Sequence, residues 1–167
     1  MTGVVILLAA AVASNPSLGK AAGACRVAEP GPAIIVDVEG LKDRAGTLRL
    51  ELYPDNDHDF LADDNVLVES GKTFARVDMP VPSIGPVAMC IRVPHAGTYS
   101  LSLLHDRDGN LKFSASTDGI GFPGNPHLGW FKPKAAATSV VAGPGLTGIR
   151  IRMNYRRGLF MRPLEGR

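Results

Sequence analysis

The sequence predicts an all-β fold, a single antiparallel two-sheet β-sandwich of about seven short strands. Three observations support this prediction. Apolar and polar residues alternate in several short runs, and no long stretch has the apolar spacing of an amphipathic helix. Glycine (19 residues) and proline (13 residues) are frequent in the 167-residue chain, which disfavours long helices. Turn-forming segments separate the alternating runs at short intervals.

The first three strands are expected over residues 34–39, 48–52 and 74–79. In the first two, an apolar set alternates with a second set that includes charged residues, as in a strand with one buried face. Residues 40–46 begin and end with glycine and form the turn between these two strands. We expect the inner face to carry Ile34, Val36, Val38, Leu48, Leu50 and Leu52.

The remaining four strands are expected over residues 87–93, 99–104, 140–141 and 149–155. The last is the clearest, because its apolar residues alternate with Arg150, Arg152 and Asn154, as on a face in contact with water. Residues 94–97 and 143–145 supply turns. The inner face is expected to continue through Val87, Met89, Ile91, Val93, Tyr99, Leu101, Leu103, Ile149, Ile151, Met153 and Tyr155.

Two stretches lack this alternation. Residues 54–70 are largely acidic, and residues 106–137 are long and glycine-rich. An irregular loop of such length is uncommon inside a compact domain and is often functional. We therefore expect the second stretch to form a functional site at one end of the sandwich.

The N-terminal region has features of a signal peptide. Residues 4–13 are apolar but too few to span a bilayer, and residues 22–24 (Ala-Gly-Ala) provide a small-x-small cleavage site. Residues 1–3 carry no Lys or Arg, which departs from the usual pattern, and a buried N-terminal strand or helix is the alternative. We expect a signal peptide over residues 1–24, a folded domain over 25–155 and a mobile basic tail over 156–167.

Two cysteines, Cys25 and Cys90, can pair in an oxidising compartment. Closing so long a loop is expected to add about 4 kcal/mol to stability in the chain-entropy model. A lipid anchor on Cys25 is less favoured, because residues 14–24 separate it from the apolar run; two unpaired buried thiols are the other alternative. We expect a periplasmic or secreted protein with a disulfide.

The formal net charge of +2 at pH 7 is too small to indicate nucleic-acid binding. No other segment is long and apolar enough to span a membrane. The expected partner is therefore a protein, peptide or glycan of the periplasm or cell envelope. No cofactor is expected, unless the acidic loop over residues 106–110 binds Ca²⁺.

Asp106, Asp108 and Asn110 place side-chain oxygens at alternate positions, as Ca²⁺ prefers, and Asp118 or a backbone carbonyl can complete the shell. The spacing is not that of an EF-hand, because Gly109 stands at the fourth loop position. The favoured alternative is that these side chains cap a tight turn by accepting hydrogen bonds from backbone amides.

Two motifs stand out in the second half of the chain. They are a Gly-Thr-Tyr strand that ends in His-Asp-Arg-Asp-Gly-Asn (residues 105–110) and a Gly-Ile-Gly-Phe segment (residues 119–122). Together they resemble the exported bacterial family called domain of unknown function 2141. The resemblance covers roughly residues 34–155 and implies an exported β-sandwich, Ig-like or transthyretin-like, with no established activity. Residues 111–113 depart from the family pattern, in which Asn-Gly-x-Leu-Asp continues the acidic loop.

The leading hypothesis is an exported, non-catalytic module that binds a ligand through the loop end around residues 105–132. Trp130 and Phe131 can form a stacking platform for a sugar or peptide, or can plug the end of the sandwich. A Ca²⁺-dependent module is the alternative, and a small hydrolase centred on His105 and Asp106 is less favoured. The candidate ligand-binding residues are His105, Asp106, Asp118, Phe122, Trp130 and Phe131.

Overall fold

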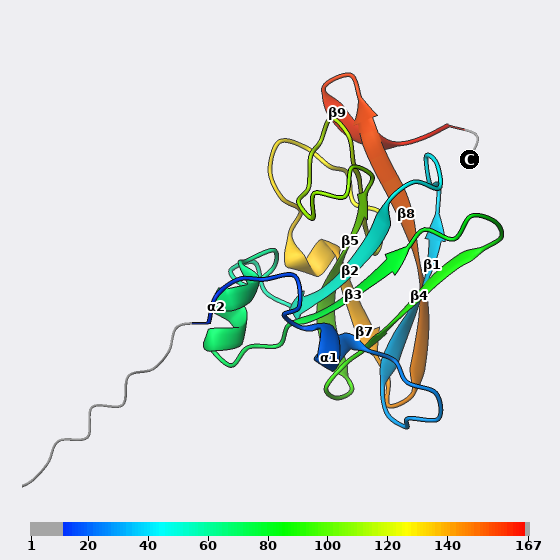
Figure 1. Ribbon diagram of the computed structural model, residues 1–167. Coiled ribbons are helices and arrows are strands. Elements are labelled where there is room, and N and C mark those ends of the chain that lie inside the picture. The colour runs from blue at the N-terminus through cyan, green and yellow to red at the C-terminus, as the bar shows by residue number, and fades with distance from the viewer. Residues whose placement is uncertain (1–11, 166–167) are drawn as a thin grey trace, which may run out of the picture.

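The computed structural model describes residues 12–165, which form nine strands in one mixed sheet that curls into a nearly closed barrel (Figure 1). Two short helices, α1 (Lys20–Gly23) and α2 (Asp64–Glu69), and the 3₁₀ turn η1 (Ala135–Ala137) accompany it. The strands are β1 (Ala33–Glu39), β2 (Thr47–Pro54), β3 (Ala75–Pro80), β4 (Val87–Arg92), β5 (Gly97–Asp106), β6 (Gly119–Phe122), β7 (Ser139–Ala142), β8 (Leu146–Arg157) and β9 (Phe160–Pro163).

The predicted antiparallel two-sheet sandwich of seven strands is wrong. All seven expected segments form strands, but they join β6 and β9 in one sheet of order β3-β2-β5-β6-β8-β1-β4, with β7 paired to β5 and β9 to β8. β1 and β8 run parallel. Alternation determines which face of a strand is buried but not which strand lies beside it. The long β5 and β8 each pair with several strands, which merges the two expected sheets into one.

A seam runs between the two end strands of the sheet order, β3 and β4. β3 and β4 contact each other but are not hydrogen-bonded neighbours, and α1 contacts both of them. Cys25, which follows α1 closely, forms a disulfide with Cys90 of β4, so the predicted pairing is confirmed. The disulfide therefore holds the segment after α1 to one side of the seam.

The barrel interior is built from the predicted inner face. Burying one such aliphatic side chain contributes about 1.5–3 kcal/mol relative to leaving it exposed, so this interior is the main source of stability. Its fully buried members include Ile34, Val36, Leu48, Leu50, Leu52, Ile91, Leu101, Leu103, Ile151 and Met153.

A second apolar cluster covers part of the outer barrel wall. Tyr53 and Phe122 face outward from β2 and β6, because their neighbours Leu52 and Gly121 face inward. Phe60 packs edge to face on Tyr53, with ring centroids 5.6 Å apart. The two stretches without alternation thus fold over the barrel and supply Phe60, Leu67, Leu128 and Ala135 of this cluster, and Phe74, just before β3, completes it.

The expected signal peptide and mobile tail can be compared with the structure only in part. Most of the apolar run predicted as the signal-peptide core lies outside the described residues. Of the basic tail expected to be mobile from residue 156, a part is regular, because β8 continues to Arg157 and β9 pairs with it in an antiparallel hairpin. Among residues 12–165, no helix has the length and apolar character needed to cross a membrane.

Candidate functional site

A row of residues crosses the end of the barrel from β5 to β8. The register places His105 opposite Gly119, and Gly119 opposite Tyr155. Neighbouring strands lie about 4.8 Å apart, so His105 and Tyr155 are separated by two such spacings. Because Gly119 has no side chain, the two rings meet across it, with His105 Nδ1 2.7 Å from the Tyr155 hydroxyl oxygen.

The hydrogen bonds of His105 identify its neutral tautomer. Nε2 lies 2.7 Å from the carbonyl oxygen of Ala45, which can only accept, so Nε2 carries the hydrogen. Nδ1 then accepts from the Tyr155 hydroxyl, and that hydroxyl oxygen accepts from the backbone amide of Lys42 at 3.0 Å. Every polar atom of this set has a partner inside the protein.

Burial keeps both rings uncharged near neutral pH. Desolvation lowers the pKa of His105, whose side chain is 0% exposed. Desolvation also raises the pKa of Tyr155 to about 12. A fully buried histidine with both nitrogens engaged serves the fold, so this geometry gives the hydrolase hypothesis no support.

Asp106 organises the acidic loop that follows β5. One carboxylate oxygen accepts from the backbone amides of Gly109 (2.9 Å) and Asn110 (3.2 Å), and the other from the amide of Leu111 (2.9 Å). The carboxylate is 1% exposed, so these amides replace the water that it loses. Asp106 therefore has the turn-capping role that the sequence analysis favours.

Asp118 and Arg107 fasten the same loop to its surroundings. Asp118 is also 1% exposed and accepts from the amides of Arg107 (3.0 Å) and Ser114 (2.8 Å). The Arg107 guanidinium donates to the carbonyl of Thr117 (2.7 Å) and to the Asp43 carboxylate (2.9 Å from Nε). This hydrogen bond lowers the pKa of Asp43. The turn between β1 and β2 is thus tied to the acidic loop.

Three carboxylates of this loop can approach one ion. Asp106, Asp108 and Asp118 each offer one oxygen, and these oxygens all lie within 4.8 Å of one another. Asn110, the third predicted ligand, turns its side-chain oxygen to the amide of Lys112 (2.8 Å). Since the buried carboxylates already accept from amides, the loop conformation is explained without a metal, and Ca²⁺ binding stays a prediction.

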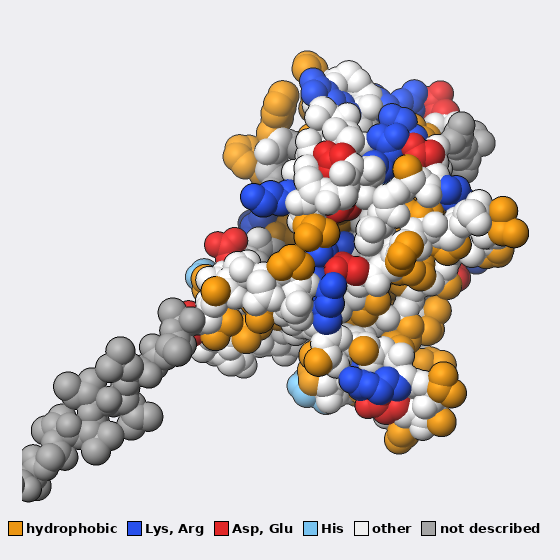
Figure 2. All heavy atoms as spheres, in the orientation of Figure 1, with side chains coloured by type: hydrophobic (Ala, Val, Ile, Leu, Met, Phe, Trp, Pro, Cys, Tyr) orange, Lys and Arg blue, Asp and Glu red, His pale blue; other side chains and the backbone are white. Residues whose placement is uncertain are grey.

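An apolar pocket of about 270 Å³ opens where the outer cluster meets solvent. Phe122 lines its floor, and Trp130 and Phe131 at its mouth are 74% and 89% exposed. Hydrophobic side chains project from the upper left of Figure 2, where Figure 1 shows the loop after β6 in yellow. The remaining lining residues are Leu61, Phe113, Ile120, Leu128, Gly129, Lys132, Pro133 and Met161.

The structure thus divides the predicted ligand-binding residues into two groups. Phe122, Trp130 and Phe131 share this pocket, whereas His105, Asp106 and Asp118 build the barrel end and its loop. The other lining residues are not apparent from the sequence. Leu61 and Met161 come from segments far from the loop in sequence. Phe113 offered a signal, because it is an aromatic residue where the sequence departs from the family pattern.

The rim of the pocket is held in place. The ammonium of Lys132 donates to the backbone carbonyls of Asp57 (2.8 Å) and Phe60 (2.5 Å). The Trp130 ring packs edge to face on Phe160 of β9, with centroids 5.9 Å apart. These contacts position Trp130 and Lys132, on either side of Phe131, before any ligand binds, which reduces the entropy cost of binding.

Comparison with protein families matches residues 36–149 to a family described as uncharacterised proteins conserved in bacteria (DUF2141). The chain belongs to the DUF2141 family. Comparisons with curated proteins and with solved structures find no match. The matched part of this DUF2141 chain contains both motifs on which the resemblance rests. These motifs build the His105 row and the capped loop, and Phe122 of the second motif also lines the apolar pocket.

The free energy of unfolding should rise with pH over the range in which His105 loses its proton. In the unfolded chain the His105 ring has a pKa near 6.5, which is above its lowered pKa in the folded protein. Below about pH 6.5 the unfolded chain therefore binds more protons, and stability falls toward the folded pKa. We expect His105→Gln to flatten the dependence of the urea unfolding free energy between about pH 7.5 and pH 5.5. The exposed His127→Gln serves as control, and an unchanged slope in His105→Gln would contradict the assignment.

Gly119→Ala should destabilise the barrel. The added Cβ would lie 2.4 Å from Cε1 of Tyr155, whose ring is held by His105. Such overpacking costs about 1–3 kcal/mol, measurable by urea unfolding. The matched control is Gly148→Ala in β8, where an added Cβ meets nothing within 4 Å. Equal stability of the two variants would show that β6 does not need an empty inner face.

Proposed function

We propose that this protein is an exported, non-catalytic module that binds an apolar side chain of a peptide or protein partner in the pocket formed by Phe122, Trp130 and Phe131. The observation that carries the proposal is the exposure of two large aromatic side chains, 74% and 89%, at the mouth of a preformed apolar pocket. Aromatic residues in such positions commonly supply most of the energy of an interface.

The dimensions and chemistry of the pocket favour a peptide over a glycan. Its volume of about 270 Å³ is below the range of about 300–1,000 Å³ typical of small-molecule sites, so it suits one side chain of a larger partner. Its one charged lining residue, Lys132, already donates to two carbonyls. A sugar needs several polar groups for its hydroxyls, which this lining does not offer.

Two features support the export part of the proposal. Residues 4–13 have the composition of a signal-peptide core. The Cys25–Cys90 disulfide is typical of proteins in oxidising compartments, such as the bacterial periplasm. We therefore place the binding function in the periplasm or outside the cell.

Trp130 is the only tryptophan of the chain, so its fluorescence reports directly on the proposed site. The test uses short peptides that differ only in one central residue. We expect a peptide with Phe or Leu at that position to change the Trp130 emission saturably, and a peptide with Ala there to leave it unchanged. Phe131→Ala should weaken binding at least about tenfold without loss of stability, because the side chain is 89% exposed.

The control for this titration is Ile84→Ala, which removes a side chain that is 82% exposed and does not line the pocket. It should bind as the parent protein does. The binding proposal would be refuted if no peptide changes the Trp130 emission, or if the Phe131→Ala variant binds with the same affinity as the parent protein.

The Ca²⁺ prediction is tested by thermal melts in EDTA and in millimolar Ca²⁺, with Mg²⁺ at the same concentration as control. A ligand that binds only the folded state raises Tm. We expect no Ca²⁺-specific rise, because Asp106 and Asp118 are committed to backbone amides. A rise that the exposed Asp108→Ala variant abolishes would instead establish a Ca²⁺-dependent module.

A further inference from the structure

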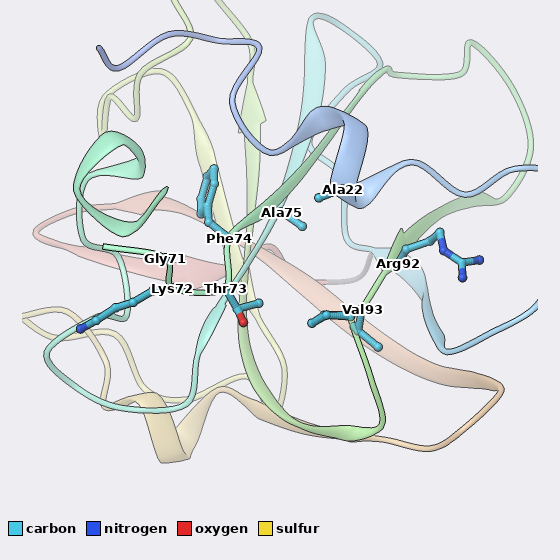
Figure 3. Close-up of a pocket in the computed structure, with 9 residues that line it drawn as sticks. Ala22, Gly71, Lys72, Thr73, Phe74, Ala75, Arg92 and Val93 are labelled. Atoms are coloured by element: carbon cyan, nitrogen blue, oxygen red, sulfur yellow. The ribbon is translucent and has the colours of Figure 1, made fainter. Parts of the chain in front are cut away.

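The segment over residues 14–23, which we call the N-terminal strap, lies along the barrel seam. Figure 3 shows Ala22 of α1 over Ala75 of β3, with Arg92 and Val93 across the opening at the end of β4. These residues line a pocket of about 450 Å³ between the helix and the two strands. Its helix α1 contacts both β3 and β4, so the strap covers the seam between these two strands, which are not hydrogen-bonded neighbours.

Arg76 of β3 depends on the strap for several contacts. It is 6% exposed, and its guanidinium donates to the carbonyl of Asn15 (3.2 Å) in addition to its ion pairs with Glu51 and Asp64. Its backbone amide donates to the carbonyl of Gly19 (3.1 Å). Without the strap, these buried or edge-strand donors would lose their acceptors.

Two further polar contacts fix the strap at its ends. The Ser14 hydroxyl donates to the Asp64 carboxylate, and the Lys20 ammonium lies 2.9 Å from the Asp78 carboxylate. Leu18, between them, packs against the outer apolar cluster. The strap is thus joined to the domain by apolar packing, by hydrogen bonds to its backbone carbonyls and by one ion pair.

The strap also fits closely against β3. Gly19 has a φ of +75°, and an added Cβ would lie 2.9 Å from the Phe74 ring. An added Cβ at the buried Gly23 would lie 2.8 Å from the carbonyl oxygen of Arg76. A removable leader needs small residues only around its cleavage site, whereas both of these glycines are explained by the folded domain.

We propose that the exported protein keeps the strap and begins at Ser14, because a leader peptidase cleaves after Ala13 and not after Ala24. This inference rests on the export part of the proposed function. Ala11-Val12-Ala13 is a small-x-small site directly at the end of the apolar run. Water adds across the amide: the C–N bond between Ala13 and Ser14 breaks, Ala13 keeps the carboxylate and Ser14 gains a free amino group.

The test is the N-terminus of the full chain expressed with its own leader region in a Gram-negative bacterium. Intact mass and N-terminal sequencing of the periplasmic protein should give Ser14. A protein that begins at Cys25 would overturn the cleavage position and leave export intact. An uncleaved chain in the cytoplasm would overturn both the cleavage and the export on which it rests.

Matched variants separate the two cleavage sites. Ala13→Asp should block processing, because a charged residue replaces the small one that the peptidase requires, and Ala24→Asp should be processed as the parent chain is. The opposite pattern would refute the proposal. In the mature protein, Gly23→Ala should lower Tm on the order of 5 °C, whereas Gly145→Ala, which meets nothing within 4 Å, should not. An unchanged Tm for Gly23→Ala would refute the packing on which the proposal depends.

Discussion

The end of the barrel depends on a strand with an empty inner face. Gly119 and Gly121 of β6 leave room for side chains of β5 and β8 to meet across the strand that separates them; an added Cβ at Gly121 would lie 2.6 Å from Cγ2 of Ile151. The contact between His105 and Tyr155 follows from this gap. That contact in turn fixes the β1–β2 turn through Lys42 and Ala45, against which the acidic loop is fastened.

The inner faces could be predicted from sequence, and the strand pairing could not. Alternation is a local consequence of backbone geometry, so Leu50 and Leu103 were assignable to the core from their neighbours alone. Pairing depends on residues far apart in the chain, as in the parallel match of β1 with β8. β6 could not be predicted as a strand, because its inner positions, Gly119 and Gly121, hold no apolar side chains that would mark a buried face.

The candidate site was predictable in composition but not in arrangement. Trp130 and Phe131 were identified because large aromatic residues stand out in a glycine-rich loop, and the structure places both at one pocket with Phe122. The oxygens of Asp106 and Asp118 looked equally suited to a cation or to backbone amides, because sequence spacing does not give the direction of a carboxylate. The fold adds what the spacing does not give: it buries both groups under their own loop and turns their oxygens toward backbone amides.

The parallel pair of β1 and β8 joins residues near the two ends of the folded chain, with Ala33 opposite Leu146 and Glu39 opposite Arg152. A polypeptide that emerges from a ribosome or a membrane pore with its N-terminus first can form the early hairpins but cannot close the barrel. One edge of β1 stays unpaired until β8, which follows by more than half of the chain, has been released. Closure is thus a late, non-local event, and contacts of this kind slow folding and leave strand edges open to other chains.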